Sequence, residues 1–340
     1  MTIGVLTAGG DCPGLNAAIR GVVARATGGG NKVVGIRSGW DGLIEGKIAP
    51  LTRDDVRGIL ATGGTILGTS RTDPYLQGDG YASLAASIEK WEIETLIVIG
   101  GDGSLRSAAR INADGPVNVI GVPKTIDNDI GETDVTLGFH TAVQIVVDAL
   151  DRLTTTAESH NRVMVVEVMG RTTGWIAAAA GIAAGAEAIL IPETDIDYAD
   201  MARRIEKRHQ EGHAYSMVVV AEGAPGPTGD TQTRGKDAYG FEMLGGVGEK
   251  VAGYLKGQIG FETRVMTLGY LQRGGTPTAF DRLLGTRFGV RAAELAMEGA
   301  SGVMVALTGR DIVAVDLERA CSEVRHLDED LARAASWFVA

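Results

Sequence analysis

The sequence has little cysteine and no excess of positive charge. Its 340 residues include only Cys12 and Cys321, which offer neither a disulfide framework nor the spacing of a metal site. With 32 Lys and Arg against 43 Asp and Glu, the formal net charge is −11. This acidic balance argues against a broad surface for nucleic acid or for anionic membranes. We expect a cytoplasmic protein with neither of these as a partner.

The sequence also lacks a long apolar run and a secretion signal. Its most membrane-like stretch, "GWIAAAAGIAAGA" at 174–186, is short, rich in Ala and Gly, and ended by Glu187, so it predicts a packed helix. The first residues, "MTIGVLTAGG", carry no basic segment and predict a buried strand instead of a signal peptide.

Glycine, in contrast, is abundant. The 49 glycines show no G-X-Y period and suit tight turns and close approach of the backbone to a ligand. Short runs rich in β-branched residues alternate with amphipathic segments, which is typical of a parallel sheet with helices on both faces. The expected strands cover 3–6, 32–36, 95–100, 117–122, 162–168, 188–192, 216–223 and 263–270. The expected fold class is α/β, with two doubly wound domains and mostly parallel sheets.

Two other segments complete the expected organisation. A long helix is predicted over 141–156, where "TAVQIVVDALDRLTTT" connects the two halves. The stretch 223–246 is rich in Gly, Pro and polar residues and has no periodicity, so we expect a surface insertion.

Glycine- or charge-bearing segments follow four of the predicted strands, where ligands bind in open α/β sheets. They are "TAGGDCPG" at 7–14, "GGDGS" at 100–104, "PKTIDND" at 123–129 and "EVMGR" at 167–171. Paired glycines between a strand and a helix let backbone N–H groups approach phosphate. Asp102 is a candidate ligand of Mg²⁺, which one or two carboxylates hold together with substrate phosphates. No P-loop and no dinucleotide fingerprint occurs, which disfavours P-loop and NAD-dependent proteins.

The segment "PKTIDNDI" carries the densest charge. Interpreted as extended, it places Asp127 and Asp129 on the same side with Thr125 beside them. Two close carboxylates raise each other's pKa unless a cation answers them, and Lys124 is such a cation. Five arginines follow or enter predicted strands: Arg71, Arg162, Arg171, Arg264 and Arg273. In an acidic protein they suggest a pocket for a multiply phosphorylated substrate.

In their order along nearly the whole chain, these segments resemble 6-phosphofructokinase. The motifs are "GGDCPGLNAAIRG", "GGTILGTSR", "GGDGS", "PKTIDNDI", "ESHNRVMVVEVMGR" and "LQRGGTPTAFDR". The chain is similar to the phosphofructokinase A family, in the mixed-substrate "PKTIDND" type found in actinobacteria. The resemblance implies a transferase of glycolysis, a kinase that converts D-fructose 6-phosphate to D-fructose 1,6-bisphosphate with ATP and Mg²⁺. It also implies a homo-oligomer, a dimer or more commonly a tetramer.

The resemblance assigns roles to individual residues. Asp127 would be the base that takes the proton from the 1-hydroxyl of the sugar, with Asp129 in support, while Arg71 and Lys124 meet the transferred phosphoryl group. The donor-binding positions are Gly10, Arg71, Thr72, Gly101, Asp102, Gly103 and Ser104, of which Asp102 is linked to the metal. The positions for the sugar phosphate are Thr125, Ile126, Asp127, Arg162, Met169, Gly170, Arg171, Glu222, Arg264, Tyr270 and Arg273.

The same resemblance suggests how the chain is divided and assembled. We expect a nucleotide or phosphoryl-donor domain over 1–138 plus 277–326 and a sugar-phosphate domain over 139–276. Arg162 and Arg264 match arginines that reach the sugar phosphate from a neighbouring subunit, so active sites would be shared between subunits. Tyr270 stands where relatives often have histidine, and it brings no titratable cation. We therefore expect the binding of the sugar phosphate to be somewhat weaker or less sensitive to pH.

Two residues point to different phosphoryl donors. In the family, Lys124 is typical of pyrophosphate users, whereas Gly103 is typical of ATP users, because pyrophosphate users commonly carry an aspartate there that repels ATP. Steric exclusion outweighs an added attraction, so ATP is the expected donor, and a reversible, pyrophosphate-dependent phosphotransferase is the alternative. A catalytically silent sugar-phosphate or nucleotide sensor would have lost Asp127, Asp102 or Arg71, and all three are present.

The effector site of the allosteric bacterial members is only partly kept. Arg20, Arg53 and Glu187 fall at its positions, but Ala24 and Thr154 stand where arginines would. A pocket short of cations binds a polyanion poorly. We expect weak responses to ADP and phosphoenolpyruvate.

Overall fold

The computed structural model describes residues 1–236 and 242–337, which fall into two compact units. The first comprises Met1–Thr141 and Arg273–Val324, and the second comprises Ala142–Gln272 and Arg325–Ala340. Within the described parts of the chain, every helix is too short or too polar to cross a membrane.

The first unit is built on a mostly parallel sheet with the strand order β14-β13-β5-β4-β1-β2-β3, in which β6 also pairs with β5. The edge strands β3 and β14 run antiparallel to their neighbours. In chain order the strands are β1 (Thr2–Ala8), β2 (Lys32–Ile36), β3 (Ile48–Pro50), β4 (Thr95–Gly100), β5 (Asn118–Thr125), β6 (Leu137–Gly138), β13 (Val303–Thr308) and β14 (Asp311–Asp316). β4 is buried at every residue, as a strand covered on both faces must be.

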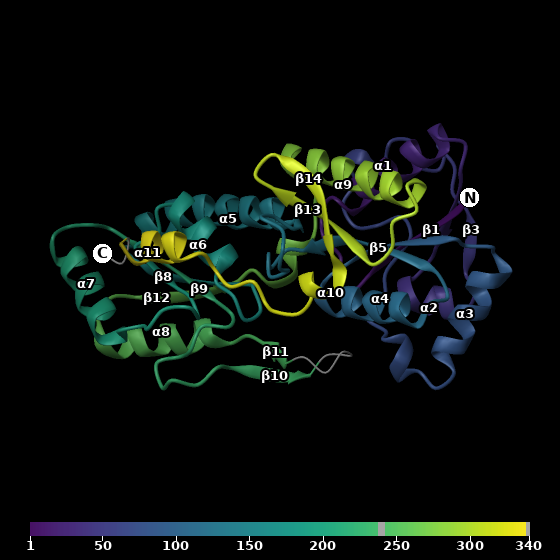
Figure 1. Cartoon of the computed structure of the whole chain (residues 1–340). Helices are drawn as coiled ribbons and strands as arrows, with labels where there is room; N and C mark the ends of the chain where they lie inside the picture. Colours follow the sequence, from purple (N-terminus) through teal and green to yellow (C-terminus); the bar gives the residue numbers. More distant parts are fainter. Residues whose placement is uncertain (237–241, 338–340) are drawn as a thin grey trace. The chain divides into compact units, whose positions relative to one another are not determined.

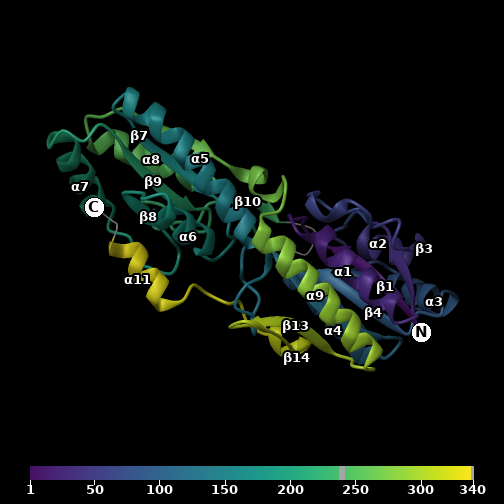
Figure 2. The same ribbon diagram turned by 90° about the horizontal axis from the view of Figure 1, so that it is seen from above.

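Helices cover both faces of this sheet (Figure 1). They are α1 (Leu15–Gly28), α2 (Gly39–Ile44), α3 (Gly80–Lys90), α4 (Asp102–Asp114), α9 (Ala279–Met297) and α10 (Leu317–Ala320), with short 3₁₀ turns η1 (Ile59–Ala61) and η2 (Pro74–Leu76). α1 and α9 lie side by side on one face (Figure 2). Their backbones approach closely because glycine occupies the contact: a Cβ on Gly289 would lie 2.1 Å from the carbonyl oxygen of Ala18. α2, α3 and α4 pack on the other face.

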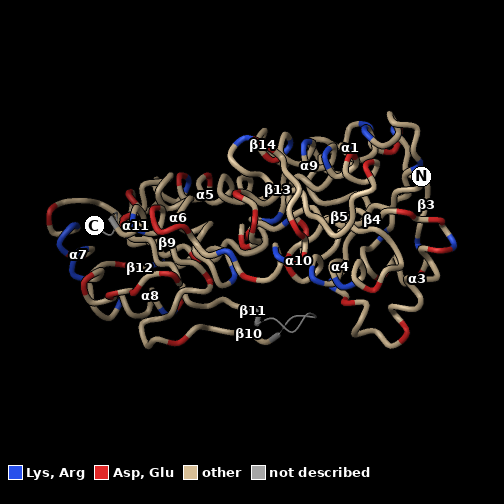
Figure 3. The backbone as a smooth tube through the Cα atoms, in the orientation of Figure 1, with Lys and Arg blue, Asp and Glu red and all other residues tan. Residues whose placement is uncertain are grey.

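The second unit has a parallel sheet of its own, with the order β12-β7-β9-β8. Its strands are β7 (Val163–Val168), β8 (Ala188–Leu190), β9 (Ser216–Ala221) and β12 (Thr263–Thr267), and a separate hairpin joins β10 (Thr233–Lys236) to β11 (Glu242–Leu244). Its helices are α6 (Trp175–Ala183), α7 (Tyr198–Gln210), α8 (Val247–Gln258) and α11 (Glu329–Trp337). Buried residues of α7 and α8 form one core with β7 and β9. Figure 3 shows the basic residues of α7, which has Lys207 and Arg208 in its last turn.

The predicted fold class is confirmed, and each predicted strand is a strand of the structure. The apolar stretch at 174–186 forms the packed helix α6, and the predicted long helix is α5 (Phe139–Ser159). α5 begins in the first unit and continues into the second. The short helix η3 (Gly269–Arg273) begins in the second unit and ends in the first. The antiparallel edge strands and the hairpin within 223–246 were not predicted, because short, half-exposed strands lack the continuous apolar pattern. Residues 237–241 of that segment lie outside the described residues.

Candidate active site

Three loops meet at the carboxyl edge of the first sheet. β1 pairs in parallel with β4, with Ala8 opposite Gly100, and β4 pairs in parallel with β5, with Gly100 opposite Pro123. The chain leaves β1 for β2 on one side, whereas β4 lies on the other. The loops that follow β1 and β4 therefore flank a topological switch point, the place where open α/β sheets bind ligands.

The glycines of the loop after β1 leave the backbone open to a ligand and to cationic side chains. Gly9 has a φ of 82°, its N–H donates to Ser70 O at 2.8 Å, and its carbonyl accepts from Thr69 Oγ1 at 2.6 Å. A Cβ on Gly10 would lie 2.6 Å from Nη1 of Arg273, so a side chain there would displace that guanidinium. Arg273 also donates to Asp11 O at 3.2 Å. The structure thus places Arg273 beside the loop that follows β1.

α4 begins at the loop after β4. Gly101 is its N-cap, Asp102 is its first residue, and Ser104 is almost fully buried. A carboxylate in the first turn is favourable because the helix dipole is positive there. Asp102 Oδ1 accepts from Nε of Arg106 at 2.8 Å. The sequence-predicted donor positions at 101–104 therefore form one helix N-terminus at the switch point.

Lys124 is a buried cation between these loops. Its side chain is 2% exposed, and its Nζ donates to the carbonyl oxygen of Gly10. The pKa of Lys124 is lowered to about 8, mainly by burial and in part by Arg273, whereas Asp11 and Asp127 act in the opposite direction. Burial also raises the pKa of the neighbouring Cys12 thiol to about 12, so this thiol stays protonated.

The acidic segment after β5 is not extended, and our prediction of simple alternation is wrong. β5 ends at Thr125, whose Oγ1 accepts from the N–H of Asp127 at 3.1 Å, and Asn128 has a φ of 54°. Asparagine tolerates this left-handed conformation. Its Oδ1 accepts from Thr136 N at 2.8 Å, which fixes the turn. Asp127 and Asp129 are 3% and 4% exposed, so both carboxylates are still buried, and Asp127 is close enough to Lys124 to raise its pKa. Ile126, between them and the strand, is fully buried.

In the second unit, four predicted residues gather at the carboxyl edge. Gly170 and Arg171 follow β7 with φ values of 145° and 52°. Arg171 N donates to Glu222 Oε1 at 3.0 Å, and Met169 N donates to Gln272 Oε1 at 3.2 Å. Glu222 follows β9. The loop after β7 is therefore held by side chains from the two neighbouring connections, and the sequence had not identified Gln272, which is fully buried.

Two predicted arginines lie at the opposite edge of that sheet. Arg162 immediately precedes β7, and Arg264 lies opposite Met164 near the start of β12. Both pair with Glu262, Arg162 at 2.7 Å, and this pairing, Arg162 foremost, lowers the pKa of Glu262. Strands rise about 3.3 Å per residue, so β7 separates these arginines from the loop at its other end by roughly 17 Å. Within a single chain, therefore, Arg162 and Arg264 do not lie close to Arg171.

The comparison with known proteins identifies the family. The pattern of the family described as Phosphofructokinase matches residues 2–296. The chain belongs to the phosphofructokinase family. It is 49% identical over 328 residues to ATP-dependent 6-phosphofructokinase 3 of Streptomyces coelicolor, with 96% of each chain covered. It is 48% identical over 342 residues to a pyrophosphate–fructose 6-phosphate 1-phosphotransferase of Amycolatopsis methanolica, with 99% of each covered.

A solved structure agrees. The phosphofructokinase of Pichia pastoris in the T-state matches with a TM-score of 0.84 and 31% identity over 99% of this chain. The present phosphofructokinase chain covers 36% of that larger one.

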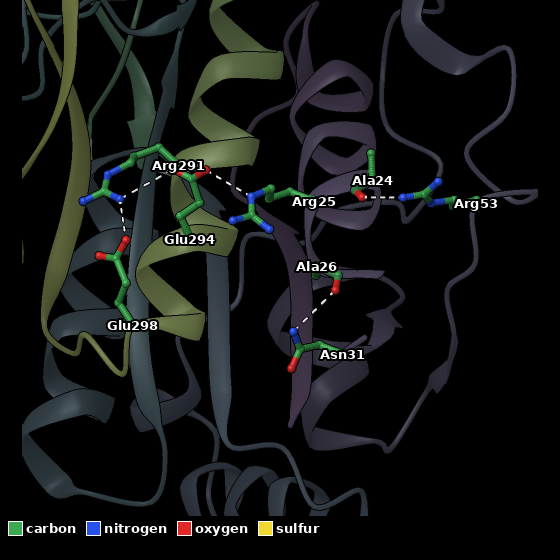
Figure 4. A network of polar contacts seen from close by, with 8 residues as sticks. All are labelled: Ala24, Arg25, Ala26, Asn31, Arg53, Arg291, Glu294 and Glu298. Atoms are coloured by element: carbon green, nitrogen blue, oxygen red, sulfur yellow. Dashed lines mark hydrogen bonds and ion pairs between the residues drawn. The ribbon is translucent and has the colours of Figure 1, made fainter. Parts of the chain in front are cut away.

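Two of the residues expected at an effector site, Arg53 and Glu187, make hydrogen bonds within this chain. Arg53 donates from Nη2 to Ala24 O at 3.0 Å and from Nε to Thr27 Oγ1 at 2.9 Å, close to the ion pair between Arg25 and Glu294 (Figure 4). In the second unit, Glu187 is 8% exposed. It accepts from Arg208 Nη2 at 2.8 Å and from Met217 N at 2.6 Å.

Two carboxylates near the phosphofructokinase motifs were missed by the sequence analysis. Asp11 follows the first glycine pair just as Asp102 follows the second, and this repeated Gly-Gly-Asp was the available signal. Asp281, in the first turn of α9, is fully buried and accepts from Gly138 N at 2.9 Å and Thr141 N at 2.7 Å. It caps the start of α5, a long-range contact that no local pattern indicates.

Proposed function

We propose that the chain is a 6-phosphofructokinase that transfers the terminal phosphoryl group of ATP to the 1-hydroxyl of D-fructose 6-phosphate, forming D-fructose 1,6-bisphosphate in glycolysis. The observation that carries this proposal is a pair of buried charged groups at the switch point, Lys124 and Asp127. The ammonium of Lys124 donates to the backbone carbonyl of Gly10 in the glycine loop after β1. Phosphoryl transfer needs such a base, neutralising charge and oriented N–H groups. Membership of the phosphofructokinase family supports it.

The phosphoryl donor is assigned to the domain expected over 1–138 plus 277–326. Gly10, Arg71, Thr72, Gly101, Asp102, Gly103 and Ser104 would hold it. A single carboxylate at a helix N-terminus suits Mg²⁺, which takes its other ligands from substrate phosphates and water. Among the described residues no group of three or more His, Cys, Asp or Glu side chains could hold a metal ion by itself. Mg²⁺ would thus come with the donor and offset the charge of its phosphates at Asp102.

In this mechanism Asp127 accepts the proton of the 1-hydroxyl as the oxygen attacks phosphorus. Arg71 and Lys124 offset the negative charge on the phosphoryl group, and Asp129 supports Asp127 in the same site. Thr125 orients Asp127 through the hydrogen bond to its backbone N–H. Burial leaves the ammonium of Lys124 poorly solvated, which lowers its pKa and lets its charge act strongly on a phosphate.

As the family resemblance implies, the sugar phosphate is assigned to Thr125, Ile126 and Asp127 and to residues of the domain expected over 139–276, Arg273 among them. The contributing residues of the second unit are Met169, Gly170, Arg171, Glu222 and the 75% exposed Tyr270. Arg162 and Arg264 would serve the site of a neighbouring subunit, because they lie at the far edge of their own sheet. The active enzyme is accordingly a cytoplasmic homo-oligomer, a dimer or tetramer.

Overall identity does not select the donor, since relatives named for ATP and for pyrophosphate are 49% and 48% identical. Gly103 favours ATP. It is the second residue of α4 and adds no side chain where the α-phosphate of ATP would approach the helix N-terminus. Lys124 serves the terminal phosphate of either donor. Pyrophosphate remains the second candidate on the strength of Lys124.

A single assay tests both parts of the proposal. Fructose 6-phosphate turnover is measured with ATP and with pyrophosphate, in the native protein and in Gly103→Asp. We expect ATP to be preferred, and the variant to lose ATP-dependent activity about tenfold or more, since one desolvated like-charge contact costs at least about 1.4 kcal/mol. Gly253→Asp is the matched control, because a side chain there meets open space. Turnover with pyrophosphate alone would overturn the donor assignment, and turnover with neither would overturn the proposed function.

A further inference from the structure

The loop that carries Arg71 is fastened at its start to the end of β1. Gly9 N donates to Ser70 O at 2.8 Å, and Thr69 Oγ1 donates to Gly9 O at 2.6 Å. Arg71 is the next residue. Among the described residues, no hydrogen bond or ion pair holds its guanidinium. Its position is therefore set by how the loop backbone is held on either side.

On its other side the loop is fastened to α4 through Tyr75. The Tyr75 hydroxyl donates to Asp114 Oδ2 at 2.5 Å, and the guanidinium carbon of Arg110 lies 3.6 Å from the centre of the Tyr75 ring. Tyr81, the second residue of α3, stacks on Tyr75 with ring centroids 5.3 Å apart. Arg110 and Asp114 are one turn apart on α4, so both side chains can contact a single aromatic ring.

The chemistry of this contact is suited to holding the Tyr75 ring in one position. A cation over a phenol ring and a hydroxyl donating to a carboxylate are both favourable, and together they fix the ring's face and its edge. Burial, followed by Asp114, raises the pKa of Tyr75, so its hydroxyl remains a donor at any physiological pH. Asp73 accepts from Tyr75 N at 3.0 Å and starts the η2 turn, which stiffens the short link back to Arg71.

We propose that Tyr75, held by Arg110 and Asp114, is a positioning residue that sets the place of Arg71 relative to the N-terminus of α4. This inference rests on the proposed function, in which Arg71 meets the transferred phosphoryl group. Tyr75 lies four positions after Arg71, a reach of at most about 14 Å. The helix that presents Asp102 at its first turn thus also holds, at its last turn, the loop that presents Arg71.

A double-mutant cycle tests the route through Arg71. We expect Tyr75→Ala to lower kcat roughly tenfold with little change in the KM for fructose 6-phosphate, because a small misplacement of a catalytic group costs rate. In an Arg71→Ala background the same substitution should cost nothing further, since its effect acts through Arg71. Tyr75→Phe keeps the ring stack and should fall between. Equal losses in both backgrounds, or no loss in the first, would overturn the inference.

Tyr254→Phe is the matched control for the loss of a hydroxyl. Tyr254 is a half-buried tyrosine whose ring contacts that of Tyr198 in the second unit, 5.7 Å away. Its substitution should leave kcat unchanged. A loss equal to that of Tyr75→Phe would show a general packing effect and would count against the inference.

Limited trypsin cleavage gives a readout that does not depend on activity. Trypsin cleaves after arginine, so the rate of cleavage after Arg71, followed by mass spectrometry, reports how firmly the loop is held. We expect Tyr75→Ala to speed this cleavage several-fold, while cleavage after the exposed Arg57 stays constant. An unchanged rate after Arg71 would overturn the inference. If the native protein fails to turn over fructose 6-phosphate, the proposed function fails, and trypsin still decides whether Tyr75 holds the loop.

Discussion

The two carboxyl edges of this phosphofructokinase are built differently. At the edge of the first sheet, Lys124, Asp127 and Asp129 are only 2%, 3% and 4% exposed. In the second unit, the half-buried Glu222 and the buried Gln272 accept hydrogen bonds from backbone N–H groups, and the candidate ligands at its two ends are more open. Tyr270 is 75% exposed, and the side chain of Arg264 is 55% exposed.

This difference separates chemistry from binding. Burying charge is costly unless it is paired, and a buried set in fixed positions is what stabilises charge as it develops in a transition state. Exposed ion pairs contribute little to stability. The arginines beside Glu262 therefore remain available to a phosphate or a neighbouring subunit. Substitutions in the first set should change kcat, and those in the second should change KM.

The largest expected effect is at Asp127. Asp127→Asn keeps the shape of the buried set but removes the base, so kcat should fall by about 10²–10⁴, with little change in sugar affinity. The check is a comparison of kcat with the fructose 6-phosphate affinity measured by calorimetry. Asp54→Asn, at a position with an 87% exposed side chain, should change neither. If Asp127→Asn keeps most of its turnover, the base has been wrongly assigned.

A smaller effect is expected at Arg162. Arg162→Ala should raise the KM for fructose 6-phosphate about tenfold and leave kcat nearly unchanged, because one charge-assisted phosphate contact is lost. Arg203→Ala, which removes another surface ion pair of the second unit, is the control and should have no effect.

The same variant tests whether sites are shared. Subunits with Arg162→Ala are exchanged with subunits carrying Asp127→Asn, and activity is followed. Recovery is expected, since some mixed sites would contain both native residues. No recovery after verified exchange would mean that each site is built within one chain.

The pH profile should show the loss of the Lys124 proton. Burial lowers its pKa from the ordinary 10.5 to about 8, and the groups that face it are the charged Asp11, Asp127 and Arg273 and the protonated thiol of Cys12. The ammonium is therefore lost as pH rises through about 8, and kcat/KM should halve near that pH. Lys124→Met should be slower and lack this alkaline limb. A native profile that stays level to pH 10 would exclude the titration of Lys124 from the reaction.

The same group has the opposite influence on stability. Between pH 8 and 10.5 the unfolded chain holds a proton on Lys124 that the folded chain has lost, so this group makes folding more favourable as pH rises across that window. Denaturant midpoints of the native protein and of Lys124→Met across that range would show the difference.

The smallest effect is expected from effectors. ADP and phosphoenolpyruvate at millimolar concentration should barely move the fructose 6-phosphate saturation curve. Ala24 and Thr154 supply no cation, and Glu187 is already paired with Arg208. A several-fold shift of half-saturation without competition at the active site would show that an effector site exists despite these residues.

Much of the first unit's edge could be anticipated from the sequence. "GGDCPG", "GGDGS" and "PKTIDND" each follow a buried strand, and parallel strands bring their carboxyl ends to one edge. The bend at Asn128 could not be anticipated. It depends on Thr136, eight residues away, which makes the long-range hydrogen bond that stabilises the turn.

The sequence by itself determined the α/β class, the family and the residue types at the site, because these depend on local periodicity and on short motifs. Only the tertiary structure decided which residues meet. It set Arg273 beside Gly10, although they are distant in the chain, and it separated Arg162 from Arg171, although they are close in it. It also showed that Tyr75 fastens the Arg71 loop to α4. The physical reason is that sheet order and register, not distance along the chain, determine which side chains share an edge.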